Sequence, residues 1–211
     1  MHTIILMNSK GGCGKTTLAT NIAAWYADEG ARVCLADYDP QRSSLDWLLA
    51  RGDYQGIPEI RAIDAVNHPL RPPKGTDILV IDAPAGTHGG EIGKLLKRVD
   101  TLLMPVLPSL IDMRACSHFL KELMASGRAA RGQIRTGIIA NRVRENTRVF
   151  QQLDQYLGDL KIPILTHLRE SQNYIRSAET GLGIFELAPS LVWQDVIQWD
   201  PVFDWLAQQQ D

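Results

Sequence analysis

Residues 9–17 read Ser-Lys-Gly-Gly-Cys-Gly-Lys-Thr-Thr, a glycine-rich segment with a lysine near each end. A short apolar run, 4–7, precedes the segment, and residues 16–27 follow it with the composition of a helix. A glycine-rich loop between a strand and a helix exposes backbone N–H groups to phosphate oxygens. The usual loop, G-x-x-x-x-G-K-[ST], has glycine where this chain has Ser9, so the segment is a variant of that motif. An ordinary strand-to-helix turn is the alternative, which four matched residue types at fixed spacing disfavour.

The residues of this loop predict separate contacts with a nucleoside triphosphate. Lys15 is expected to meet the β- and γ-phosphates, and Thr16 to offer its hydroxyl to Mg²⁺. Lys10 stands five residues earlier, too early in the loop to share the role of Lys15. The expected nucleotide-binding residues of the loop are Lys10, Gly11, Gly12, Cys13, Gly14, Lys15, Thr16 and Thr17.

Acidic residues follow two further apolar runs. Residues 33–36 lead into Asp37-Tyr38-Asp39-Pro40-Gln41, and residues 78–81 lead into Asp82-Ala83-Pro84-Ala85-Gly86. In an open parallel sheet, ligands bind outside the carboxyl ends of the strands, so these carboxylates and the glycine-rich loop are expected to share one crevice. Aspartate also caps helices, and for any one of these residues that alternative stays open. All of the strand ends together predict a site for magnesium and phosphate.

Apolar strand candidates alternate with helical patterns along the whole chain, and residues 101–106 and 136–140 are two more of the strands. This alternation predicts an α/β fold, a doubly wound, mostly parallel sheet with helices on both faces. The chain has 211 residues and no linker, repeat or low-complexity tract, so we expect a single domain over residues 1–211. Three scattered cysteines do not indicate a disulfide framework. The opening apolar run stops at Met7 and no stretch reaches 18 apolar residues, which predicts a cytoplasmic protein.

The order and spacing of these motifs resemble the ParA/MinD family of deviant phosphate-loop ATPases, and most of all its short partition ATPases. The resemblance extends over nearly the whole chain, although it is looser over residues 168–184. It rests on Lys10-Gly11-Gly12-x-Gly14-Lys15-Thr16-Thr17, Asp37-x-Asp39-Pro40-Gln41, Ile81-Asp82-Ala83-Pro84-Ala85-Gly86 and Pro105-Val106-Leu107-Pro108-Ser109.

The resemblance implies an ATPase with ATP and Mg²⁺ as cofactors and Lys10, Lys15 and Asp39 as catalytic residues. Lys10 would reach across an ATP-bound homodimer to the partner's phosphates, and Asp39 would position the attacking water. Asp37 and Asp82 would join Thr16 around the magnesium ion. The family often has an asparagine after the strand at 136–140 that pairs with the adenine, and Asn141 stands there. An ordinary turn asparagine is the alternative.

The function implied is a partition switch that dimerises with ATP, binds DNA nonspecifically and segregates plasmid or chromosomal DNA. A small ParB-like protein, or another adaptor, would stimulate hydrolysis and release the switch. The formal net charge is −2, so any DNA contact needs a local basic patch. The switch implied by the resemblance would be associated with the nucleoid in its ATP state. A solvated arginine-rich surface is the alternative. The candidates for DNA contact are Arg142, Arg144, Arg148, Arg169 and Arg176.

Two other functions stay open. One is a positioning ATPase for a non-DNA cargo such as a microcompartment or a chemosensory cluster, and the other is a regulatory MinD-like ATPase. The MinD branch ends in a basic helix that binds anionic lipid, whereas residues 190–211 contain four aspartates and no lysine or arginine, so membrane binding is disfavoured. Asp200 as N-cap and Pro201 at the first helical position are expected to split this stretch into two helices.

Overall fold

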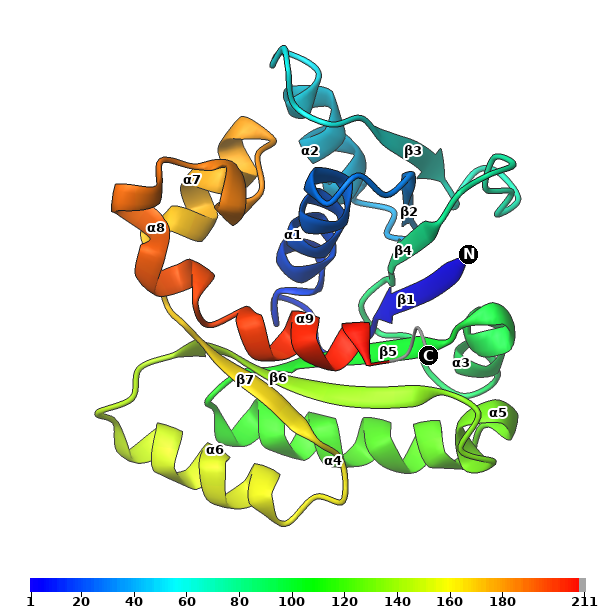
Figure 1. The fold of residues 1–211 in the computed structure, drawn as a ribbon. Helices are drawn as coiled ribbons and strands as arrows, with labels where there is room; N and C mark the ends of the chain where they lie inside the picture. Colours follow the sequence, from blue (N-terminus) through cyan, green and yellow to red (C-terminus); the bar gives the residue numbers. More distant parts are fainter. Residues whose placement is uncertain (209–211) are drawn as a thin grey trace.

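The computed structural model describes residues 1–208, and seven strands within them form one sheet in the order β3-β2-β4-β1-β5-β6-β7 (Figure 1). Every pairing in this sheet is parallel. This confirms the predicted α/β fold. The strands are β1 (His2–Leu6), β2 (Val33–Asp37), β3 (Ile60–Asp64), β4 (Ile78–Asp82), β5 (Thr101–Val106), β6 (Arg135–Val143) and β7 (Ile164–Arg169).

Helices cover both faces of the sheet (Figure 1). Successive side chains of a strand point to opposite faces, so Ile4 and Leu6 of β1 pack with one set of helices while Ile5 packs with the other. The helices are α1 (Lys15–Asp28), α2 (Ser43–Arg51), α3 (Gly90–Leu95), α4 (Leu110–Ala125), α5 (Gly127–Ala130), α6 (Arg148–Gly158), α7 (Gln172–Thr180), α8 (Pro189–Val196) and α9 (Asp200–Ala207), with short 3₁₀ helices at Leu96–Arg98 and Ile184–Glu186. Helices α1 and α9 contribute to the core on one face, and α4 and α6 to the core on the other.

The order of the strands locates the crevice. Strand β1 lies at the centre of the sheet between β4 and β5, and the chain builds the sheet outward on one side before it crosses to the other after β4. Such a reversal opens a crevice at the carboxyl ends of the strands. The loops that follow β1, β2 and β4 all emerge at this edge, and the register pairs Asp37 directly with Asp82.

The C-terminal region agrees with the sequence in part. The stretch does divide into α8 and α9, but both predicted positions are wrong by one residue. Asp200 is the first helical residue of α9 and Trp199 is its N-cap, so Pro201 is the second helical residue and not the first. Asp211 lies outside the described residues. Among residues 1–208, no helix has both the length and the apolar character needed to cross a bilayer. All three cysteines are buried with free thiols.

Candidate nucleotide-binding site

The loop between β1 and α1 needs glycine at two positions. Gly12 and Gly14 have φ angles of 75° and 98°, in the left-handed region that residues with a Cβ disfavour. A Cβ on Gly14 would also stand 2.2 Å from Nδ2 of Asn141. That same amide nitrogen donates to the carbonyl oxygen of Cys13 at 2.9 Å. The Asn141 side chain, which is buried, therefore holds the loop in place.

Both lysines of the loop are fixed through its backbone. The N–H of Lys10 donates to Oδ1 of Asn8, and the buried Asn8 amide donates in turn to the carbonyl of Pro105 at 2.7 Å. The carbonyl oxygen of Lys10 accepts from the Lys15 ammonium and from the Cys13 thiol, each at 3.2 Å. Helix α1 begins at Lys15, so its N-terminal N–H groups and the positive end of its dipole face the loop. This arrangement suits a phosphate anion.

Asp82 lies at the base of the loop. Its Oδ2 accepts from the hydroxyls of Thr16 and Ser44, both at 2.7 Å, while its Oδ1 is buried without a hydrogen-bond partner among residues 1–208. Burial raises the pKa of Asp82 to about 6, an effect that the two hydroxyls oppose. A buried carboxylate oxygen without a partner, next to a threonine hydroxyl, fits the hard oxygen ligands that Mg²⁺ prefers. Thr16 and Asp82 are thus suited to hold the ion, directly or through water.

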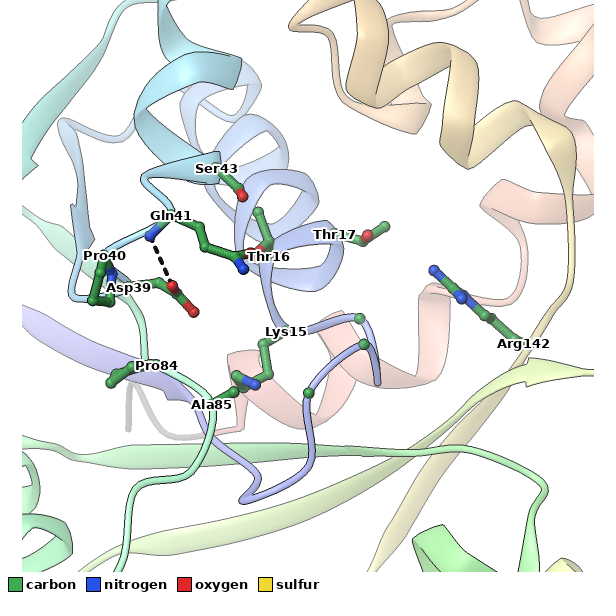
Figure 2. Close-up of a pocket in the computed structure, with 13 residues that line it drawn as sticks. Lys15, Thr16, Thr17, Asp39, Pro40, Gln41, Ser43, Pro84, Ala85 and Arg142 are labelled. Carbon is green, nitrogen blue, oxygen red and sulfur yellow. Dashed lines mark hydrogen bonds between the residues drawn. The ribbon is translucent and has the colours of Figure 1, made fainter.

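Asp37 and Asp39 lie differently although they are two residues apart. Asp37 is buried, and its carboxylate accepts from the N–H groups of Asp39 at 2.8 Å and of Ser44 at 2.9 Å, the latter at the start of α2. Burial raises the pKa of Asp37, and those N–H groups partly offset the rise. Asp39 instead stands on the rim, where its Oδ1 accepts from the N–H of Gln41 at 3.0 Å (Figure 2). Asp37 holds the loop in shape, and Asp39 faces the open site.

Part of this site lines a hollow of about 390 Å³. Its lining does not include the predicted site residues Lys10, Cys13, Asp37, Asp82 and Asn141. Figure 2 shows Lys15 and Thr16 at the loop, with Asp39 and Arg142 on opposite sides of it. The hollow brings together most of the predicted residues of the loop and Asp39. The structure also adds residues that the sequence had not indicated, since Ser44 joins Asp82 to α2 and Asn8 anchors the loop. A serine at a helix start and an asparagine at a strand end carry no local signal for these long-range bonds.

The five candidate arginines occupy different surroundings. Arg144 forms an ion pair with Glu170, and Arg169 forms one with the buried Asp195 at 2.6 Å. Arg148 is exposed at the start of α6, and Arg176 on α7 donates to Asn173 at 3.3 Å. Arg142 lines the hollow itself. The five arginines lie at or after the carboxyl ends of β6 and β7. They differ in how free their side chains are to contact a ligand.

Comparison with known proteins agrees with this geometry. The family model for the CobQ/CobB/MinD/ParA nucleotide binding domain matches residues 4–184. Maintenance of carboxysome distribution protein A of Halothiobacillus neapolitanus is 29% identical over 191 residues, which cover 88% of this chain and 87% of that protein. Chromosome-partitioning ATPase Soj of Thermus thermophilus is 47% identical over 53 residues, which cover 25% of this chain and 21% of that protein.

Solved structures share the fold. The ATP complex of a Cyanothece McdA variant superposes with a TM-score of 0.70 at 18% identity and covers 96% of each chain. The septum site-determining protein MinD of Pyrococcus horikoshii, complexed with Mg-ADP, also gives a TM-score of 0.70, at 17% identity, covering 98% of this chain and 97% of that one. From the matched domain, this chain belongs to the CobQ/CobB/MinD/ParA nucleotide-binding domain family.

Proposed function

We propose that this protein is an ATP-switched positioning ATPase whose cargo is an intracellular protein assembly of the microcompartment kind. The observation that carries this proposal is the similarity to a carboxysome distribution protein along 88% of this chain and 87% of the relative. The Soj match covers only a quarter of this chain, and it supports the shared nucleotide chemistry more than a shared cargo.

The proposed reaction is hydrolysis of ATP to ADP and phosphate. The N–H groups of the loop and the Lys15 ammonium bind the β- and γ-phosphates, because fixed donors and a buried cation compensate the charge of the triphosphate. A magnesium ion held near Thr16 and Asp82 would neutralise further phosphate charge. Asp39, on the rim of the hollow, orients the water that attacks the γ-phosphate. Asp37 keeps Asp39 in place through its bond to the Asp39 N–H.

The proposed switch is a homodimer that forms with ATP. The Lys10 ammonium makes no hydrogen bond or ion pair within residues 1–208, whereas Lys15 is turned into its own loop. A lysine at the rim of the loop is free to meet the phosphates of a second subunit. An adaptor protein would end the dimer state by stimulating hydrolysis. Before its release, the ATP-bound dimer would be cytoplasmic and held on the nucleoid by nonspecific DNA contacts.

DNA segregation is the second candidate. Protein ParA of Rhizobium radiobacter is 30% identical over 118 residues, about half of this chain, which favours this candidate. The two candidates share the ATPase cycle and differ in what is carried.

Deletion of the gene in its native host separates the candidates. We expect protein assemblies to lose their even spacing while plasmids and chromosomes are inherited normally, as seen by fluorescence microscopy and plasmid-retention counts. Complementation with the Lys15→Ala variant is expected to fail. Complementation with Arg98→Ala, a change at the amino end of the strands, is expected to succeed. Plasmid loss with normally spaced protein assemblies would contradict a protein cargo and favour DNA segregation.

A further inference from the structure

Arg142 has an unusual backbone for a residue in a strand. Its φ of 51° lies in the left-handed region, which costs conformational energy for any residue that carries a Cβ. Within residues 1–208 only Arg42 and Arg142 adopt positive φ without being glycine. Such an outlier is retained where the surrounding structure or a ligand compensates its cost.

A bulge in β6 explains this backbone. The register pairs Ala140 with His167 but Val143 with Arg169, so β6 has one residue more than β7 between these pairs. An extra residue of this kind changes the direction of a side chain. In regular alternation Asn141 and Arg142 would point to opposite faces of the sheet, yet both line the same hollow beside the phosphate loop. The bulge therefore turns Arg142 toward the nucleotide site.

This second hollow, of about 470 Å³, adjoins the first. Thr17 and Arg142 line both hollows, so they lie at the junction between them. The first hollow contains the phosphate loop, and the second is lined by one side of α7 from Gln172 to Glu179, including Tyr174 and Ile175. A nucleotide with its phosphates in the first hollow would find room for its nucleoside in the second, because the two hollows meet at Thr17 and Arg142.

The guanidinium of Arg142 is also unpaired, although Glu170 and Glu179 line the same hollow. Its guanidinium makes no hydrogen bond or ion pair with any residue from 1 to 208, whereas Arg144 and Arg169 are paired with Glu170 and Asp195. Its backbone N–H donates to Oδ1 of Asn141 at 3.0 Å, which links this residue to the asparagine that holds the loop. A free, planar guanidinium at a junction is suited to bind phosphate oxygens in a bidentate manner.

We propose that Arg142 clamps the bound nucleotide where its phosphates meet its sugar, with the guanidinium donating to oxygens of the phosphate nearest the nucleoside. This inference rests on the proposed function, which places the triphosphate in the first hollow. It moves Arg142 from the DNA-contact candidates to the nucleotide site. The strain at φ 51° is then the cost of aiming a long cationic side chain into the site.

Calorimetric titration with Mg-ATP and with Mg-ADP tests the clamp. The Arg142→Gly variant removes the guanidinium and relaxes the backbone, since glycine adopts positive φ freely. We expect its affinity for both nucleotides to fall by about tenfold or more, the effect of losing a charge-assisted contact. The loss should be equal for ATP and ADP because both carry the phosphate nearest the sugar. Its melting temperature should equal or exceed that of the wild type.

Two further variants make the result specific. Arg142→Lys keeps the charge but loses the bidentate geometry, so an intermediate affinity is expected. Arg98→Ala removes an exposed arginine just before β5, at the amino end of the strands, and should bind like the wild type. Wild-type affinity in Arg142→Gly, a loss confined to ATP, or an equal loss in Arg98→Ala would overturn the clamp. If the wild type and Lys15→Ala bind nucleotide equally, the proposed function itself fails, which is a separate result.

Discussion

At the scale of single residues, the site contains two kinds of side chain. Some hold its backbone in place, and others face the open hollow. Asp37 is buried and holds backbone N–H groups, whereas Asp39, two residues later, stands on the rim of the hollow. The backbone between them is fixed by the bond from the Asp39 N–H to Asp37. A change at Asp39 should therefore leave the loop intact, and a change at Asp37 should not.

Asp39→Ala is expected to bind ATP with wild-type affinity but to hydrolyse it roughly 100-fold more slowly, because water positioning acts in the transition state. Phosphate-release kinetics and calorimetry measure the two quantities. Asp46→Ala on α2 serves as the control, since this carboxylate does not line the hollow. Hydrolysis at the wild-type rate in Asp39→Ala would remove the proposed role.

At the scale of secondary structure, the sequence predicted the five inner strands but neither edge strand. Inner strands are buried on both faces and read as continuous apolar runs, as in Ile78–Asp82. The edge strand Ile60–Asp64 carries exposed Arg61 and Ala62. In Ile164–Arg169, the consecutive polar residues Thr166 and His167 interrupt the apolar residues, so neither strand forms such a run.

The candidate site was likewise predictable only where its residues carry a local sequence signal. Glycines and carboxylates at strand ends carry local signals, and the structure brings Lys15, Thr16 and Asp39 to one hollow and puts Asp82 beside Thr16. Ser44 contacts Asp82 across 38 residues, and Arg142 depends on a bulge in the pairing of β6 with β7. Both features arise from tertiary structure, which a local pattern does not encode.

A buried carboxylate joins three C-terminal elements. Asp195 on α8 accepts from Arg169 at the end of β7, and from Asn173 and Ser171 at the start of α7. Burial alone would raise the pKa of Asp195, but the bonds from Arg169 and Asn173 outweigh it and hold the pKa below its ordinary value. Stability from this carboxylate is therefore present above the unfolded-state pKa of about 3.9 and is lost as the pH falls through the lower folded-state value.

Asp195→Ala should lower the free energy of unfolding by about 2 kcal/mol at neutral pH, since it removes the acceptor that the Arg169 guanidinium and the buried Asn173 amide share. The loss is limited because Arg169 is partly exposed and keeps its bond to Gln194, and Asn173 keeps its bond to the Leu191 carbonyl. Urea unfolding measures the change. The difference from the wild type should shrink below about pH 4, where the wild-type carboxylate also loses its charge. Asp204→Ala, at an exposed position of α9, should stay within about 0.5 kcal/mol of the wild type. A loss equal to that control would contradict this account of Asp195.

At the scale of the whole molecule, the carboxyl edge of the sheet carries both the nucleotide hollow and the candidate arginines outside it. Arg144 and Arg148 lie near the junction of β6 and α6, and Arg176 lies on α7. A dimer built around two nucleotides would bring two such edges together. Nonspecific DNA binding would then depend on the nucleotide state and on salt.

The double variant Arg144→Glu with Arg148→Glu is expected to weaken binding of arbitrary duplex DNA by about tenfold or more in the ATP state, because favourable phosphate contacts in both subunits become repulsive. A surface-binding assay at several salt concentrations measures the affinity and its salt slope. Lys97→Glu with Arg98→Glu makes the same change in charge just before β5, at the amino end of the sheet, and is the matched control. Equal weakening in both double variants would show that net charge, rather than this edge, controls binding.

The central claim is that ATP switches the chain between two assembly states. Light scattering on the same preparation with Mg-ADP and with Mg-ATP tests it most directly. Two variants are measured in parallel: Asp39→Ala, which slows hydrolysis, and Lys10→Ala, which removes the proposed contact with the partner's phosphates. The account predicts the monomer mass with ADP, twice that mass with ATP in the wild type and in Asp39→Ala, and the monomer mass with ATP in Lys10→Ala. A wild-type chain that binds both nucleotides but has one mass in both would contradict the claim.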